Sequence, residues 1–413
     1  MEQYGISKLD LKRRNRMQIL KFLQQQGPTS RIDLSGVLEL TRAAVTIITN
    51  EMIEQGVLYE KGEVNLAGQK ASRGRKKVLI DINRNFKFAF GIAIDRKKVY
   101  IGLSNIGGDT LEKRICEIRP SDDKDGILQQ IFTHMQEMMT NNCLEKSRLI
   151  GIGICLGEWA NRFLELRTEN GVVDYQPLQQ MFEKGFGLPV SCDSIINGLG
   201  LMENDLFVQK TVGGPTVLIR FTDPIEATMT VDGEIYCGAH HRAMNFAHMV
   251  VNPNGKSCHC GNRGCLSSEC SEDSIYVDIV DAFSEENTPL LYSRMGGNPN
   301  LLRVAEVSDY ILLGDPILTE LLNERLKSFG AFLNNMISVI DPERIIFLGN
   351  QFENEQYLSK LKAYISDHFG AEIANLITVG TLQRDQLYLS GCALAIRNFF
   401  VAKGGLDSEH RKR

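Results

Sequence analysis

The segment from residue 258 to residue 265 constrains the fold of this chain more than any other. It places Cys258, Cys260 and Cys265 within eight positions, and its glycines permit tight turns, so it suits thiolate ligation of Zn²⁺. A fourth ligand is needed, and His248 is the best candidate. His259 lies between two ligands and would strain the chelate. A closed site of this kind is structural, and we expect Zn²⁺ to pin a loop and add folding free energy. The second alternative for the fourth ligand is Cys270.

The length of 413 residues exceeds one ordinary core and indicates two or three domains. The sequence contains no apolar run of about 18 residues, the length needed to span a bilayer. The first residues lack the apolar core of a secretory signal. We therefore expect a cytoplasmic protein with no membrane contact, whose ten cysteines are thiols or metal ligands.

Charge is distributed unevenly along the chain. The net charge is −5, yet residues 1–80 carry 14 basic and 8 acidic side chains. The remaining residues carry 32 basic and 43 acidic side chains. A basic head on an acidic body is typical of a DNA-binding module joined to a sensor.

The basic head predicts a winged helix-turn-helix. Apolar spacing indicates helices over about 12–26 and 31–38, and Thr41 is a good cap for a third. Ser30 can cap the second helix, with Asp33 reaching back as in a capping box. Two strands around a polar loop, at 57–59 and 77–82, complete a wing.

The third helix of the head is the expected DNA reader. If Val45 and Ile48 are buried, the N-terminal residues of that helix are exposed to the major groove. The basic stretch before the second strand suits the minor groove, although it could equally be a solvated linker. The alternative use of the whole module is contact with another protein. The predicted DNA contacts are Thr41, Arg42, Ala43, Thr46, Arg73, Gly74 and Arg75.

The body alternates strands and helices, which indicates an α/β fold of two lobes with one repeated architecture. We expect a DNA-binding domain with a basic linker at 1–82, a first lobe at 83–205 and a second lobe with the zinc loop at 206–387. The C-terminal helix, at 388–402, is expected to join the first lobe.

The chain resembles the ROK family of repressors, open reading frames and kinases over nearly its whole length. The family's histidine and C-x-C-G-x-x-G-C motif is matched at residues 248 and 258–265. Residues 40–46, L-T-R-A-A-V-T, are similar to the L-S-R-x-T-V-S recognition helix of the repressor branch. The resemblance implies a winged helix-turn-helix followed by a two-lobed actin-like, ribonuclease H-like ATPase fold. It also implies a homodimer or a dimer of dimers.

Three departures from the family's kinases imply that phosphoryl transfer is lost. The D-x-G-G-T phosphate turn is matched by residues 95–98, where bulky side chains replace the glycines. The second phosphate turn is matched by residues 221–227, which carry two acids that would repel phosphate. The aspartate that serves as general base in the family motif E-N-D-A-N aligns with Ile195, which cannot accept a proton.

The sugar-binding positions implied by the resemblance are also changed, but their side chains can still form hydrogen bonds. A sugar-like effector is therefore an open alternative to no effector. The candidate effector residues are Ser194, Asn197, Asn245, His248 and Ser267.

Three functions remain to be compared. The leading hypothesis is a sequence-specific DNA-binding regulator of carbohydrate genes, a repressor that binds a double-stranded operator. The alternatives are an active ROK sugar kinase and a protein-interaction module without DNA binding.

Overall fold

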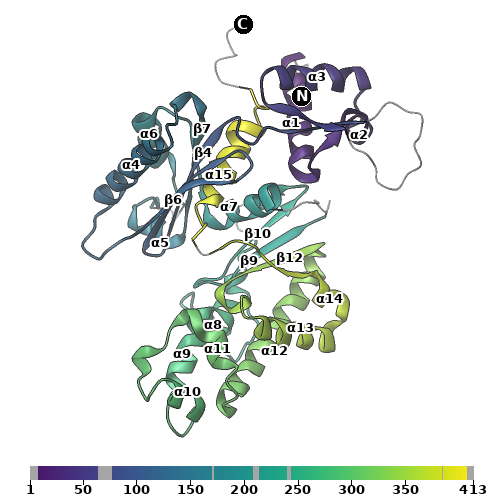
Figure 1. Ribbon diagram of the computed structural model, residues 1–413. Helices are drawn as coiled ribbons and strands as arrows, with labels where there is room; N and C mark the ends of the chain where they lie inside the picture. Colours follow the sequence, from purple (N-terminus) through teal and green to yellow (C-terminus); the bar gives the residue numbers. More distant parts are fainter. Residues whose placement is uncertain are drawn as a thin grey trace. The chain divides into compact units, whose positions relative to one another are not determined.

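The computed structural model describes residues 8–63, 77–169, 172–207, 214–239, 243–383 and 385–406. The chain divides into two compact units, shown in Figure 1. One unit comprises residues 1–211 and 383–413, and the other comprises residues 212–382. Among the described helices, none has the length and apolarity needed to cross a membrane.

The head of the first unit holds three helices and a three-stranded antiparallel sheet of order β1-β3-β2. Its core is formed by apolar side chains from all three helices and from β3, among them Leu20, Leu34, Val45 and Ile80, each with no exposed surface. The elements are α1 (Lys8–Gln26), β1 (Thr29–Ser30), α2 (Arg31–Val37), α3 (Arg42–Glu54), β2 (Leu58–Glu63) and β3 (Val78–Ile82).

The start of α2 differs from the predicted capping box. Ser30 caps the helix, and its hydroxyl accepts a hydrogen bond from the backbone N–H of Asp33. The Asp33 carboxylate does not bind the backbone N–H of Ser30, as the box requires. It accepts hydrogen bonds from the Ser30 hydroxyl, at 2.6 Å, and from the Lys77 ammonium, at 2.8 Å. Ser30 lies in β1 and pairs with Leu79 of β3, which fixes its backbone in the sheet.

The rest of the first unit is built on a five-stranded sheet of order β6-β5-β4-β7-β8. The β4, β5 and β6 strands are antiparallel neighbours, whereas β7 and β8 run parallel to β4. The strands are β4 (Phe88–Asp95), β5 (Lys98–Asn105), β6 (Thr110–Glu117), β7 (Leu149–Leu156) and β8 (Val190–Ser194). The helices are α4 (Lys124–Asn141), α5 (Glu158–Phe163), α6 (Gln176–Phe186), α7 (Ile195–Met202) and α15 (Leu389–Ala395).

The two faces of this sheet bury different side chains. Phe90 and Ile92 of β4 belong to the large apolar core that α4, α5 and α6 cover. Gly91 alternates with them and faces α15, which lies beside α7 (Figure 1). A Cβ atom on Gly153 would lie 1.9 Å from the carbonyl oxygen of Gly391, so glycine is needed for α15 to approach the sheet.

The sequence predicts one C-terminal helix at 388–402, but the structure divides this segment into two helices of different type. α15 ends at Ala395 and the chain continues as the π-helix η7 (Ile396–Val401). The wider turn places two consecutive aromatic residues in separate contacts. Phe399 packs against Gly151, and the ring of Phe400 lies 6.3 Å from that of Phe86. Residues 402–406, which follow η7, are called the strap below.

The second unit contains a sheet of order β11-β10-β9-β12-β13, in which β9 and β12 are parallel. Its core includes a cluster of phenylalanines at positions 221, 329, 347 and 352. The strands are β9 (Thr216–Arg220), β10 (Glu226–Val231), β11 (Glu234–Ile235), β12 (Arg344–Leu348) and β13 (Ile377–Val379). The α-helices are α8 (Leu266–Cys270), α9 (Glu272–Ala282), α10 (Pro289–Arg294), α11 (Val307–Ile311), α12 (Pro316–Ile340), α13 (Glu355–Phe369) and α14 (Ala371–Leu376). The predicted α/β fold is confirmed.

Candidate DNA-binding and metal sites

The N-terminal half of α3 presents a polar face to solvent. The Thr41 hydroxyl caps the helix by accepting a hydrogen bond from the N–H of Ala44 at 3.2 Å. Val45, Ile48 and Met52 are buried, as their spacing predicts. The four predicted groove residues of this helix are therefore exposed: Thr41, Arg42, Ala43 and Thr46.

Two further residues of α3 share this face and were not singled out in the sequence. Ile47 is 68% exposed, and Asn50 is also exposed. They follow Ala43 by four and seven positions, the spacing of one helical face. Residues 42–50 contain no acidic side chain. The exposed face of α3 is thus free of carboxylates over its N-terminal half.

Arg31 fixes α3 relative to its neighbours. Its guanidinium donates hydrogen bonds to the hydroxyl of Thr49 at 3.0 Å and to the side-chain oxygen of Asn50 at 2.9 Å. It also pairs with Glu60 of β2 at 3.0 Å. One side chain at the start of α2 therefore joins the helix pair to the wing. The other predicted DNA contacts, Arg73, Gly74 and Arg75, lie outside the described residues.

A cluster of one histidine and three cysteines lies in the second unit. The ligand atoms of His248, Cys258, Cys260 and Cys265 all lie within 4.8 Å of one another. The sulfurs of Cys260 and Cys265 are 3.6 Å apart, and Nδ1 of His248 is 3.6 Å from the sulfur of Cys258. Two sulfurs on a tetrahedral metal with 2.3 Å bonds are about 3.8 Å apart. The cluster can therefore hold a metal ion.

The loop between the cysteines is closed by its own backbone. The N–H of Cys258 donates to the carbonyl of Asn262, and the N–H of Gly264 donates to that of Lys256. Gly264 has a φ of +66°, and a Cβ atom there would lie 1.5 Å from the carbonyl oxygen of Asn252. Only glycine fits this position, which explains the second glycine of the motif.

The thiols of the cluster differ in their surroundings. Burial raises the pKa of Cys265 to about 12, whereas the backbone N–H of Asn262 lowers the pKa of Cys260. A cation bound by the cluster would favour the thiolate form of Cys265. Of the alternatives for the fourth ligand, His259 lies beside the cluster, with its Nδ1 3.9 Å from the sulfur of Cys258. Cys270 is buried in the apolar core instead.

A buried charge network anchors the metal loop to the helices around it. Arg325 of α12 is 5% exposed and pairs with Glu269 of α8 and Asp278 of α9. Lys256 joins the same network, through a 2.5 Å contact between its Nζ and Asp278 and a 2.7 Å bond from its backbone N–H to Glu269. Removal of one member of such a buried network would leave an uncompensated charge and destabilise the protein. The network therefore fixes the metal loop against α8, α9 and α12.

The candidate effector residues fall in both units. Ser194 caps α7 by accepting from the N–H of Asn197, whose side-chain amide donates to Asp193 at 2.9 Å. These two residues lie together at the end of β8. In the second unit Asn245 is exposed, His248 belongs to the metal cluster, and the buried hydroxyl of Ser267 accepts from the N–H of Ile225 at 2.7 Å.

Comparison with known proteins identifies the family to which this chain belongs. The model of the ROK family matches residues 89–393 of the chain. The chain belongs to the ROK family. The match covers both sheets of the body, and the head lies before it.

Several named transcriptional regulators match over most of their length. The xylose repressor of Caldicellulosiruptor bescii is 23% identical over 393 residues, covering 92% of this chain and 95% of the relative. The DNA-binding transcriptional repressor Mlc of Escherichia coli is 25% identical over 345 residues, covering 81% and 80%. A crystal structure of a ROK family transcriptional regulator, a homologue of that Mlc protein, superposes with a TM-score of 0.73 at 25% identity, covering 96% of this chain and 98% of the other.

Three segments that the resemblance to ROK kinases singled out have defined local structure. Ile195 is fully buried at the first turn of α7. Arg96 has a φ of +52° in the tight turn between β4 and β5. Arg220 and Glu226, at the two ends of the 221–226 loop, form a 3.1 Å ion pair in which both side chains are largely buried.

Proposed function

We propose that this ROK protein is a sequence-specific DNA-binding transcriptional regulator, a repressor of carbohydrate genes. The observation that carries the proposal is the exposed, carboxylate-free face of α3, held by the Thr41 cap and the Arg31 contacts. An exposed helix N-terminus of this kind reads base edges in the major groove. Arg42 would donate two hydrogen bonds to a guanine, and Ala43 would contact a thymine methyl group.

We assign the contacts with the minor groove to Arg73, Gly74 and Arg75. We also propose that the protein acts as a homodimer or a dimer of dimers, which would place two α3 helices on the half-sites of a palindrome. The similarity to named repressors and to a ROK transcriptional regulator over most of the chain supports the assignment as a DNA-binding regulator.

The metal cluster is assigned a structural Zn²⁺. Its donor set of three sulfurs and one imidazole, with no open position, is the kind that closes structural zinc sites. His248, Cys258, Cys260 and Cys265 would hold the ion and keep the loop folded against α8 and α9.

We assign to the body the binding of an effector. The body does not transfer a phosphoryl group in this proposal. Ser194 and Asn197, at the end of β8 in the first unit, are assigned to binding a sugar-like ligand. Asn245 and Ser267 are the further candidate effector residues of the second unit. α7 starts at the end of β8 and continues into the π-helix η2 (Glu203–Phe207), which contacts α1 of the head. A ligand that favours one arrangement of α7 would therefore act on the head, provided that it binds the two arrangements with different affinity.

A mobility-shift titration tests the central assignment. The probe is the DNA upstream of the protein's own gene, and the control is a shuffled fragment of equal length. We expect a shift of the upstream fragment that weakens steeply with salt, because neutralised phosphates release counterions. Equal shifts with both fragments, or no shift at any concentration, would contradict the proposal.

A further inference from the structure

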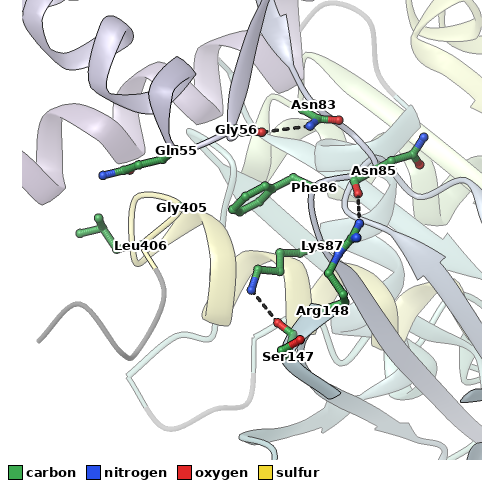
Figure 2. A pocket seen from close by; sticks show the side chains of 10 residues that line it. All are labelled: Gln55, Gly56, Asn83, Asn85, Phe86, Lys87, Ser147, Arg148, Gly405 and Leu406. Carbon is green, nitrogen blue, oxygen red and sulfur yellow. Dashed lines mark hydrogen bonds between the residues drawn. The ribbon is translucent and has the colours of Figure 1, made fainter. Parts of the chain in front are cut away.

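A pocket lies where the head, the first sheet and the strap meet, inside the first unit (Figure 2). Its volume is about 530 Å³, within the range of small-molecule sites. Gln55 comes from the end of α3, Phe86 and Lys87 from the connection into β4, Arg148 from the segment before β7, and Gly405 from the strap. The pocket is separate from the metal cluster and from the proposed effector residues.

The lining is cationic. Among the described residues that line it are Lys87 and Arg148 and no carboxylate. Lys87 is 9% exposed, and its Nζ donates to the carbonyl of Ser147 at 2.7 Å. Arg148 is exposed, and its Nη2 donates to the carbonyl of Asn85 at 2.6 Å. A guanidinium carries five N–H donors in a planar fork that matches carboxylate and phosphate oxygens.

The remaining lining suits a small polar ligand. The side-chain amides of Gln55, at the end of α3, and Asn83, between β3 and β4, line one wall of the pocket. The Asn83 amide donates a hydrogen bond to the carbonyl of Gly56 at 3.0 Å. The ring of Phe86 also lines the pocket, beside the strap residue Gly405 in Figure 2. Two cations, side-chain amides and one aromatic ring together favour a hydroxylated anion over an apolar molecule.

We propose that this pocket binds a small oxyanion metabolite, whose phosphate or carboxylate group is held by Lys87 and Arg148. An occupant would contact the head, the sheet and the strap at once. Binding there would consequently bias the orientation of α3, and only this regulatory consequence rests on the proposed DNA-binding function.

Isothermal titration of the full-length protein tests the site directly. The probes are inorganic phosphate and citrate, each titrated without DNA at an ionic strength held constant with KCl. We expect at least one of them to bind. Phosphate alone would identify a phosphorylated ligand, and citrate alone would identify a carboxylate ligand. Arg148→Gln and Lys87→Gln should each weaken binding about tenfold or more, which corresponds to one charge-assisted hydrogen bond.

Lys184→Gln is the matched control, because Lys184 is an exposed cation of the same unit that does not line the pocket. It should leave binding unchanged. Arg148 is exposed, so its variant keeps the test valid even if Lys87→Gln does not fold. Failure of both anions to bind at up to about 10 mM would overturn the proposal. Equal affinity in wild type and both pocket variants, or equal weakening by Lys184→Gln, would also overturn it. Because no DNA is present, these outcomes leave the proposed function untouched.

Discussion

Arg16 and Gly404, 388 positions apart in the chain, are joined by a 2.7 Å hydrogen bond from Nε of the arginine to the glycine carbonyl. The same guanidinium donates to the side-chain oxygen of Gln55 at 2.7 Å, and Arg16 has no exposed surface. Gly404 has a φ of +66°, and a Cβ atom there would lie 2.9 Å from Cβ of Arg16. The strap, which follows the C-terminal π-helix of the first unit, thus binds directly to α1 of the head.

Loss of this contact should destabilise the protein. Arg16→Ala removes one buried and one partly buried hydrogen bond, and we expect the free energy of unfolding to fall by about 2–4 kcal/mol. Chemical denaturation measures the change. Arg14→Ala, an exposed arginine on the same helix, should change the free energy by less than about 0.5 kcal/mol. Similar effects of the two substitutions would show that the strap contact contributes little.

The cap of α3 should control the opening of that helix. Thr41→Ala removes the acceptor for the Ala44 N–H, which should cost about 1 kcal/mol. Hydrogen exchange at the first amides of α3 should speed up by about fivefold. Thr41→Ser keeps the hydroxyl and should leave exchange near the wild-type rate. Unchanged exchange in Thr41→Ala would mean that the cap does not limit local opening.

Removal of a cluster cysteine should release the metal and lower thermal stability. Cys260→Ser leaves three of four ligands, and we expect metal content below one equivalent and a melting temperature lower by several degrees. Elemental analysis and calorimetry measure both. Cys143→Ser is the control, because this exposed cysteine lies in the first unit. A full complement of zinc in Cys260→Ser, with an unaltered melting temperature, would remove the structural role of the cluster.

Ile195 should behave as a core residue. Ile195→Asp buries a carboxylate at a position with no exposed surface and should cost at least about 3 kcal/mol. Ile195→Val should cost about 1 kcal/mol.

An ADP-release assay with a panel of sugars should show no turnover by the wild-type protein. Turnover above background would show that the body is an enzyme after all.

The local patterns of the sequence predicted much of the fold. The alternation of strands and helices along the body predicted the α/β fold that the structure shows. The buried face of α3 followed from the spacing of Val45, Ile48 and Met52. In both cases neighbouring residues carry the whole signal.

Features that depend on distant contacts could not be predicted in this way. Arg16 lies in a run of basic residues and would be expected in solvent, yet the strap and Gln55 bury it. The pocket has no local signature, since its walls come from four separate stretches of chain. The π-helix after Ala395 likewise accompanies contacts of Phe399 with Gly151 and of Phe400 with Phe86, which the sequence around it does not show.

Selection of DNA sites from a random library, by wild type and by Arg42→Ala, tests the central claim most directly. The account predicts that the wild-type protein enriches one palindromic site. Arg42→Ala should lose preference at one base pair in each half-site, with binding weaker by about 1–3 kcal/mol. Arg162→Ala, an exposed arginine of α5, should select the wild-type site. Identical sites selected by wild type and Arg42→Ala, or no enriched site for either, would contradict the claim that α3 reads DNA.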